Sequence, residues 1–256
     1  MINNIGDNWL LLRGLARETE HWGAFTSLLQ TVFPLAQIKT LDLPGTGQYY
    51  QQSSPSNISE ITNQIRQQAY KQGLLEKPLT LVALSMGGMV AWEWMQKYPD
   101  DINAAVLINT SFASLSPFYQ RLRWKSYAKL ASIILTTNIY QREQAILKLV
   151  TNNRQNDAVN IAHWHEIQTR RPVNLSNSLR QIIAAARYKP TNEKPKQAVL
   201  LLNSWGDRLV DPACSIAIQK KWHIDLHTHP WAGHDLSLDD SNWLAHHLKI
   251  WIESHT

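Results

Sequence analysis

Cysteine is nearly absent from this chain, and long apolar runs are absent too. With Cys214 as its one cysteine, the chain cannot form an internal disulfide framework or a zinc site built on several cysteines. No apolar run approaches the roughly 18–20 residues that a membrane-spanning helix needs. The first residues, Met1–Asn8, have neither the basic region nor the apolar stretch of a secretory signal, so we expect a cytoplasmic protein.

Apolar and aromatic residues, in contrast, are plentiful. Hydrophobic residues make up 44% of the 256 positions and eleven residues are tryptophan, which excludes a disordered chain and supplies bulky side chains for a core. This length fits one large α/β domain that carries an insertion.

The charge is distributed unevenly along the chain. The net charge is +5, yet the segment Ser111–Pro190 holds twelve Lys and Arg residues against three acids, so the remainder is net acidic. This segregation indicates a separate structural piece with either a solvated basic surface or an anionic partner, such as an acidic carrier protein. The basic residues form no known nucleic-acid-binding module, so we expect no nucleic-acid partner.

Six short apolar runs predict the strands of a mostly parallel sheet. Most are rich in Leu, Val or Ile, as in strands that are buried on both faces. The runs are Trp9–Leu12, Gln37–Leu41, Leu79–Leu84, Ala104–Asn109, Val199–Asn203 and Ile224–His229. Apolar residues at helical spacing predict the helices Trp22–Val32, Ser59–Gln72, Met86–Tyr98 and Ser241–Glu253. This alternation predicts an α/β fold with helices on both faces of the sheet and a ligand site at the carboxyl ends of the strands.

One segment interrupts the alternation. It contains helical patterns and no convincing strand, the patterns being Arg123–Leu135, Arg142–Thr151, Asp157–Gln168 and Ser176–Arg187. We therefore expect three parts: the first part of the sheet domain at residues 1–111, a helical cap at 112–195, and the second part of the sheet domain at 196–256.

A serine stands at the junction of a predicted strand and a predicted helix. Leu79–Leu84 runs directly into Ser85-Met86-Gly87-Gly88. A sharp turn there strains the serine backbone and raises its hydroxyl above the sheet, while the helix N-terminus offers N–H groups to a developing anion. The alternative is a helix-capping serine, which is common at the start of a helix. The position directly after a buried strand favours a nucleophile.

A histidine and an acid follow other strands in the order that this chemistry requires. His234 follows the last predicted strand, and Asp207 follows the strand before it. A serine nucleophile needs a histidine base, and the base needs a carboxylate to orient it. Asp211 competes with Asp207 for that role, but Asp211-Pro212 is typical of a helix start.

The order Ser85, Asp207, His234 is that of the α/β-hydrolases, and the chain resembles that family over nearly its whole length. Asp42-Leu-Pro-Gly-Thr-Gly47 is similar to the family's D-x-P-G-x-G loop, and Arg13-Gly14-Leu15 with Trp22 is placed like its H-G loop and downstream tryptophan. Within the family, the short basic cap most resembles the pimeloyl-acyl-carrier-protein methyl ester esterases. The resemblance implies an α/β-hydrolase fold with an inserted helical cap.

Two residues depart from the family pattern. Ala83 stands two positions before the nucleophile, where glycine is commonest, and Arg13 stands where the family usually has histidine. A guanidinium at position 13 could contact a substrate carboxylate or an internal acid. Arg13 and Trp22 are therefore our candidates for substrate binding, while His21 could replace the missing loop histidine or be structural.

The other histidines have simpler explanations than metal binding. His163 and His165 lack accompanying carboxylates or cysteines, and His223, His227 and His229 lie on or beside one strand. We expect neither a metal nor a cofactor.

Taken with the resemblance, these residues predict a serine hydrolase that cleaves a carboxylic ester or thioester, with an anionic or carrier-linked substrate as one possibility. Ser85 would attack, His234 would take its proton, and Asp207 would orient the imidazole. The backbone N–H groups of Leu15 and Met86 would stabilise the oxyanion. The alternatives are other chemistry on the same scaffold, such as carbon–carbon bond hydrolysis or acyl transfer, and a non-catalytic binding protein.

Overall fold

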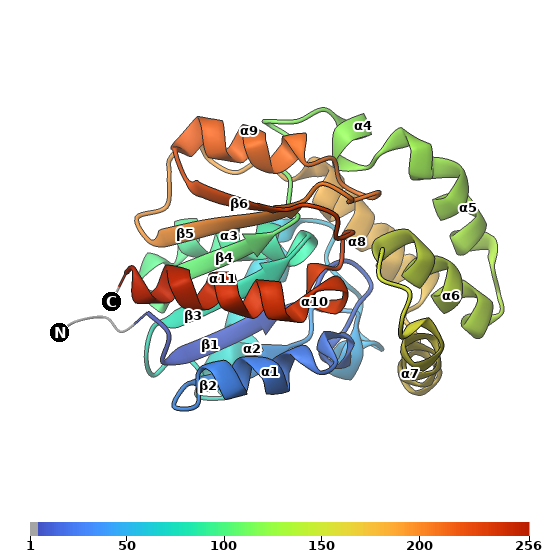
Figure 1. Cartoon of the computed structure of the whole chain (residues 1–256), viewed down its shortest axis with the longest axis horizontal. Coiled ribbons are helices and arrows are strands. Elements are labelled where there is room, and N and C mark those ends of the chain that lie inside the picture. Colours follow the sequence, from blue (N-terminus) through green and yellow to red (C-terminus); the bar gives the residue numbers. More distant parts are fainter. Residues whose placement is uncertain (1–4, 256) are drawn as a thin grey trace.

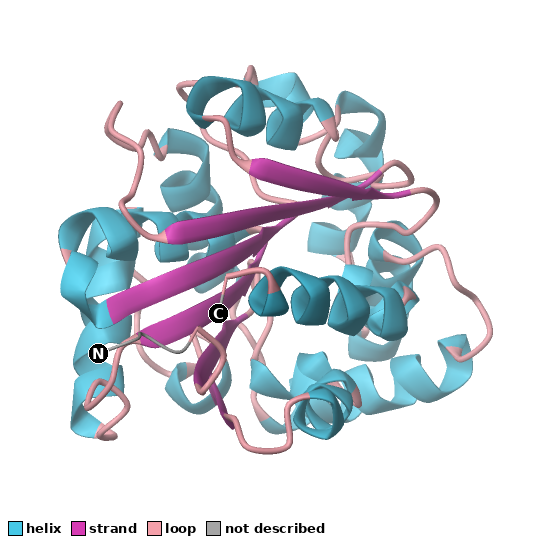
Figure 2. Ribbon diagram, turned by 60° about the vertical axis from the view of Figure 1, so that its left-hand side comes forward, coloured by secondary structure: helices cyan, strands magenta, loops and turns pink. Residues whose placement is uncertain are grey.

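A computed structural model of the chain describes residues 5–255 and shows a twisted six-stranded sheet (Figure 2). The strands are β1 (Asn8–Leu12), β2 (Gln37–Leu41), β3 (Leu79–Leu84), β4 (Ile102–Ile108), β5 (Ala198–Ser204) and β6 (Asp225–His229). They pair in the order β2-β1-β3-β4-β5-β6, and every pairing is parallel. The α/β fold and all six strands are as predicted, with strand ends within two residues of the expected ones.

Helices cover both faces of the sheet (Figure 1). One face packs against α2 (Ile58–Lys71), α3 (Met86–Lys97) and α9 (Ala213–Trp222). The other face packs against α1 (Phe25–Val32) and α11 (Ser241–Glu253). Alternate strand residues enter the two cores, Leu10 and Leu12 into the first and Trp9 and Leu11 into the second, because successive side chains of a strand point to opposite faces.

The first helix begins later than predicted. Thr19–Trp22 forms a short 3-10 turn (η1), and α1 starts only at Phe25. Gly23, which has a φ of 52°, separates the two because a single continuous helix cannot contain that backbone conformation.

The segment between β4 and β5 contains helices and, within the described chain, no strand. We call α4–α8 the insertion helices: α4 (Phe118–Arg121), α5 (Tyr127–Leu135), α6 (Ile139–Val150), α7 (Asp157–Arg170) and α8 (Leu175–Arg187). The strand arrows in Figure 1 point toward them, so these helices stand over the carboxyl edge of the sheet. In residues 5–255 no helix is both long enough and apolar enough to cross a membrane.

Candidate active site

Ser85 occupies the turn between β3 and α3 in a strained conformation. Its φ is 56° and its ψ −115°, values that a residue with a side chain rarely adopts. Such strain costs about 1–3 kcal/mol and is stored mainly at functional sites. The turn is fixed on both sides, because the Ser85 N–H donates to the Ile108 carbonyl at 2.8 Å and the Thr110 hydroxyl donates to the Ser85 carbonyl at 2.8 Å.

Two glycines allow the neighbouring backbone to approach this turn. A Cβ atom at Gly87 would lie 2.6 Å from the carbonyl oxygen of Leu12, so α3 and the end of β1 fit together only without a side chain there. A Cβ atom at Gly14 would lie 3.1 Å from the Ser85 Cβ. The loop after β1 therefore lies directly against the serine.

His234 is oriented by Asp207. The two side chains are buried, and His234 Nδ1 lies 2.7 Å from Asp207 Oδ2. The second oxygen of Asp207 accepts hydrogen bonds from the N–H groups of Leu209 at 2.7 Å and Val210 at 2.9 Å, which fixes the carboxylate. Asp211 instead accepts from the Ala213 N–H at 3.0 Å at the start of α9, as its sequence context predicts.

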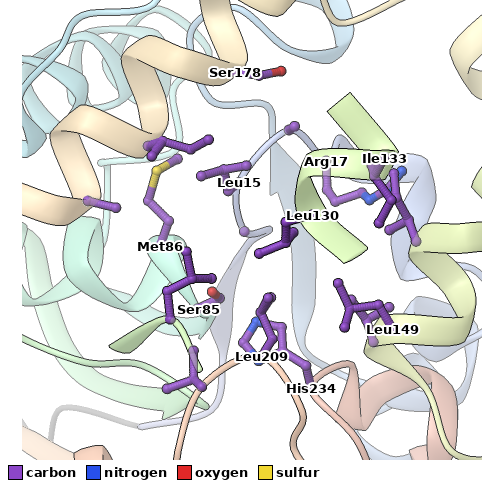
Figure 3. A pocket seen from close by; sticks show the side chains of 18 of the residues that line it. Leu15, Arg17, Ser85, Met86, Leu130, Ile133, Leu149, Ser178, Leu209 and His234 are labelled. Atoms are coloured by element: carbon purple, nitrogen blue, oxygen red, sulfur yellow. The ribbon is translucent and has the colours of Figure 1, made fainter. Parts of the chain in front are cut away.

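Ser85 and His234 face one cavity, as Figure 3 shows. In the described part of the chain, no hydrogen bond joins the side chains of Ser85 and His234. The distance between a serine nucleophile and its histidine base is often long until substrate binds. The cavity measures about 560 Å³, which is within the usual range for a small-molecule site. Leu15 and Met86 also line it, and neither backbone N–H donates to another described residue, so both are available to a ligand.

The wall of the cavity over the serine comes from the insertion helices and is apolar. Its side chains include Leu130, Ile133, Ile134, Ile146, Leu149 and Leu179. Residues far apart in sequence thus enclose the space above Ser85.

Asn109 was not predicted from the sequence as a site residue. It has a φ of 49° and its side-chain amide donates to the carbonyl of His234 at 2.8 Å. Asn109 thereby ties the turn after β4 to the histidine loop. The signal was present in the sequence, since asparagine directly after a buried strand is a residue type that tolerates positive φ.

Arg13 contacts an internal acid. Its guanidinium forms a two-pronged ion pair with Asp235 and also donates to the Ser237 hydroxyl at 3.2 Å, with all three side chains buried. Burial alone would raise the pKa of Asp235, but the Arg13 charge and the Ser237 hydroxyl outweigh it and hold that pKa below its ordinary value. The pair joins the loop after β1 to the residue that follows His234.

Trp22 does not have the position expected of a substrate contact. It is buried, its ring lies 4.8 Å from the Arg13 guanidinium, and it is not among the described residues that line the cavity. The structure thus places Trp22 against the Arg13 guanidinium and away from the cavity.

His21 is buried and does not line the cavity either. Its Nδ1 accepts from the Glu18 N–H at 3.1 Å, and burial together with the charges of Arg17 and Arg13 holds the pKa of His21 well below its ordinary value. The imidazole is therefore neutral and structural, one of the two roles expected for it.

Each of the other arginines that line the cavity also has an internal partner. Arg17 pairs with buried Glu143 of α6 at 2.6 Å, and Arg142 lies 3.7 Å from the same carboxylate. Arg121 donates to the carbonyls of Ala185 and Ala186 near the end of α8. The cavity thus has four arginines and two acids in its lining together with an apolar wall, and Arg121 is the arginine whose described partners are backbone carbonyls alone.

A reactive cysteine and a metal centre would be the alternatives to a serine nucleophile. Burial raises the pKa of the Cys214 thiol to about 11, so it is not a thiolate at neutral pH. Within residues 5–255, no group of three or more His, Cys, Asp or Glu side chains is arranged to hold a metal ion. His163 lies 3.4 Å from the Glu20 carbonyl, and His165 packs on Tyr140.

Comparisons with known proteins identify the family. The model of the family described as serine aminopeptidase, S33, matches residues 39–241, so the chain belongs to that family and is a hydrolase of the α/β-hydrolase class. No curated protein matches the sequence. Neither the family model nor the similar structures described next single out the pimeloyl-acyl-carrier-protein methyl ester esterases.

Solved structures of α/β-hydrolases superpose on nearly the whole chain. A protein from Mycobacterium tuberculosis named as a non-heme bromoperoxidase matches with a TM-score of 0.77 at 18% identity, covering 99% of this chain and 94% of its own. An esterase from a Rhodococcus species matches with a TM-score of 0.77 at 14% identity, covering 99% and 93%. A thermophilic esterase from Thermogutta terrifontis matches with a TM-score of 0.74 at 16% identity, covering 99% and 92%. At these identities the likeness establishes the fold.

Proposed function

We propose that this member of the serine aminopeptidase S33 family is a serine esterase with Ser85, His234 and Asp207 as its catalytic triad. The observation that carries the proposal is the His234–Asp207 contact of 2.7 Å beside a serine held in a strained strand-to-helix turn. Two of the similar structures are named as esterases, which agrees with this activity. The insertion helices, within residues 112–195, would form the cap over the site.

The proposed reaction has two steps at one acyl carbon. His234 removes the proton of the Ser85 hydroxyl as the oxygen attacks the ester carbonyl, and it then donates that proton to the departing alcohol. Asp207 holds the imidazole in the correct tautomer and stabilises its positive charge. In the second step His234 activates a water molecule, which releases the acid from the acyl-enzyme.

The N–H groups of Leu15 and Met86 would stabilise the negative oxygen of the tetrahedral intermediate. Both residues line the cavity beside Ser85, and Met86 is the first residue of α3, where the helix dipole favours an anion. In well-studied enzymes the loss of one such donor costs about 3–4 kcal/mol of transition-state stabilisation.

The wall of the cavity favours an apolar acyl group. Its apolar wall can bury an alkyl or aryl chain, and burial of each CH₂ stabilises a complex by about 0.8 kcal/mol. Arg13, Arg17 and Arg142 each lie beside an acid, and Arg121 donates to two backbone carbonyls, so these guanidinium groups already have partners inside the protein. An aminopeptidase substrate would need a free carboxylate for its amino group, but Glu143 and Asp235 face arginines.

The test is a panel of p-nitrophenyl esters with acyl chains from acetyl to decanoyl, together with aminoacyl p-nitroanilides. We expect hydrolysis of the esters, faster for medium chains than for acetate, and no release of nitroaniline. Ser85→Ala should abolish turnover, and Asp207→Asn should lower kcat by about 10⁴-fold, because an amide does not hold the imidazole in the same tautomer.

Asp211→Asn is the matched control for the acid, since this side chain caps α9 and does not contact His234. It should leave kcat within a few fold of wild type. A crippled Asp211→Asn variant beside an active Asp207→Asn variant would refute the assigned triad.

A further inference from the structure

The solvent-facing side of α5 and of the turn before it is apolar. Trp124 is 63% exposed and Leu135 is 79% exposed, and Tyr127 and Ile134 are exposed as well. Phe118 and Tyr119 of α4 continue the same exposed group, and the rings of Phe118 and Tyr127 lie 6.2 Å apart. Single exposed apolar residues are ordinary in folded proteins, whereas a contiguous group marks an interaction surface.

Helical spacing arranges these residues into a stripe. Trp124, Tyr127, Ala128, Ala131, Ile134 and Leu135 follow one another at intervals of one or three residues, and all six are exposed. The side chains of Ser126 and Ile133 are buried, and Leu130 and Ile133 line the cavity. Ile134 lies at the boundary between the two sides, because it lines the cavity and is also 45% exposed. The segment therefore has one apolar face on the cavity and a second apolar face on the solvent.

A basic row runs beside the exposed stripe. Lys125 and Lys129 are exposed and four residues apart, and neither ammonium has an acidic partner in the described chain. No Asp or Glu occurs at residues 102–142. The Lys125 ammonium lies 5.8 Å from the Trp124 ring, so the charge and the aromatic side chain belong to one surface.

We propose that this α4–α5 surface, composed of Phe118, Tyr119, Trp124, Lys125, Tyr127, Lys129, Ile134 and Leu135, docks on an anionic lipid bilayer. Apolar side chains on one face of a helix enter the boundary between headgroups and acyl chains, and aromatic side chains are favoured at that depth. Lysines beside them attract anionic headgroups.

The combination of an apolar stripe with lysines, in a segment without Asp or Glu, favours a lipid surface over a protein partner. An acidic protein would satisfy the lysines but would leave the aromatic stripe against polar groups, whereas an anionic bilayer satisfies both features in one plane. Docking in this orientation places the lipid against a helix whose other side lines the cavity. Docking itself does not require Ser85 to be a nucleophile.

The experiment is sedimentation of the full chain with vesicles, measured without any substrate. Vesicles of phosphatidylcholine are compared with vesicles of phosphatidylcholine and phosphatidylglycerol in equal amounts. We expect binding to the mixed vesicles to be about tenfold tighter, and added salt to weaken it. Lys125→Gln with Lys129→Gln should remove that preference. Trp124→Ser with Leu135→Ser should weaken binding to both vesicle types by more than tenfold.

Matched controls lie elsewhere on the surface. Leu35→Ser removes an apolar side chain that is 95% exposed, and Lys220→Gln with Lys221→Gln removes two exposed lysines of α9. Both controls should bind as wild type does. The substituted lysines are exposed and unpaired, so the variant at Lys125 and Lys129 should keep the wild-type unfolding midpoint. If the variant at Trp124 and Leu135 fails to fold, the lysine variant alone decides the test.

Three results would overturn the proposal. The first is no sedimentation of wild type with either vesicle, including the case in which the chain binds an acidic protein instead. The second is an equal loss of binding in the Leu35 or Lys220 and Lys221 controls. The third is a wild-type dimer in gel filtration together with a monomeric Trp124 and Leu135 variant that still binds vesicles as wild type does.

Discussion

The insertion helices are attached to the sheet domain in two different ways. Helices α6–α8 are joined to it by ion pairs and hydrogen bonds, many of them buried, whereas α5 packs beside α6 and the turn that precedes it. Both parts form walls of the same cavity. The contrast indicates that one wall is tied by polar contacts to the loop that carries Leu15, while the other wall lacks such contacts along its length.

The polar attachments of α6–α8 converge on the loops near Ser85. Arg17 of the β1 loop pairs with Glu143 of α6, and Arg171 beyond α7 pairs with Glu18. Gln181 of α8 accepts from the N–H of Ala16 at 2.8 Å. Each contact fixes the loop that carries the proposed oxyanion donor.

The side chains of Tyr127–Leu135 make no hydrogen bond or ion pair with another element of the described chain. Polar anchors precede α5, where the Arg123 N–H donates to the Leu209 carbonyl at 2.9 Å and the Ser126 hydroxyl donates to the Arg208 carbonyl at 2.6 Å. Helix α5 is thus fixed at its beginning and held by apolar packing along its length, which is the condition for local opening.

Loss of the buried ion pair between Arg17 and Glu143 should have a large effect on stability. Glu143→Gln leaves the Arg17 guanidinium buried without an acid, and loss of one partner of such a pair costs about 3–5 kcal/mol. Urea denaturation followed by circular dichroism measures this change.

Glu166→Gln on α7 is its control, because Glu166 is 67% exposed and pairs with an exposed arginine at 3.8 Å. Its free energy of unfolding should change by about 0–1 kcal/mol. If both variants changed the free energy of unfolding by less than about 1 kcal/mol, the buried Arg17–Glu143 pair would contribute no more than an exposed ion pair.

The Arg13–Asp235 pair tests the coupling of the loop after β1 to the loop that carries His234, the proposed base. Asp235→Asn should lower kcat by about 10²-fold, because small displacements of reacting groups have effects of that size, and KM should change little since the apolar wall is untouched. Ester kinetics separate the two constants. Asp225→Asn, at an exposed site on β6, should behave as wild type. A rise in KM with kcat unchanged would make Arg13 a substrate-binding residue instead.

Hydrogen exchange should distinguish the two halves of the insertion directly. We expect amides of Tyr127–Leu135 to exchange at least tenfold faster than those of α6 and α8, a difference in opening free energy of about 1.4 kcal/mol or more. Mass spectrometry of peptic fragments resolves these segments. Equal protection of α5 and α6 would remove the contrast between them.

A smaller effect should appear in the pH dependence of stability, because the neutral His21 lies among the fixed loops. Its pKa is held well below the ordinary value of 6.5, so the unfolded chain binds a proton that the folded chain does not. Stability should therefore be fully present above pH 6.5 and be lost as the pH falls below it, by up to about 1.4 kcal/mol per pH unit. His21→Asn should reduce this slope, and an unchanged slope would assign the effect to another group.

Much of the fold could be predicted because it depends on local pattern. The all-apolar run Leu79–Leu84 indicated a central strand, and its direct junction with Ser85 located the sharp turn. The helix at Trp22 was placed wrongly, since the glycine that ends the 3-10 turn lies within an apolar spacing that looks continuous. Of α9, the sequence indicated only the start, at Asp211-Pro212.

The partners inside the site could not be predicted in the same way. Arg13 meets an acid 222 residues away and Arg17 meets one 126 residues away, and no periodicity of the chain connects such positions. From the sequence, the arginine that stands at position 13 in place of the family's histidine was compatible with either a substrate contact or an internal ion pair. Folding selected the internal pair because a buried guanidinium without a carboxylate is costly.

The most direct test of the proposed chemistry is to locate a covalent label. A fluorophosphonate should react with the folded chain at one residue, and mass spectrometry of the digest should place the adduct on the peptide that contains Ser85. Ser85→Ala, with an unfolding midpoint like that of wild type, should carry no adduct. An adduct on another residue, or an unlabelled wild type, would contradict the assignment of Ser85 as the nucleophile.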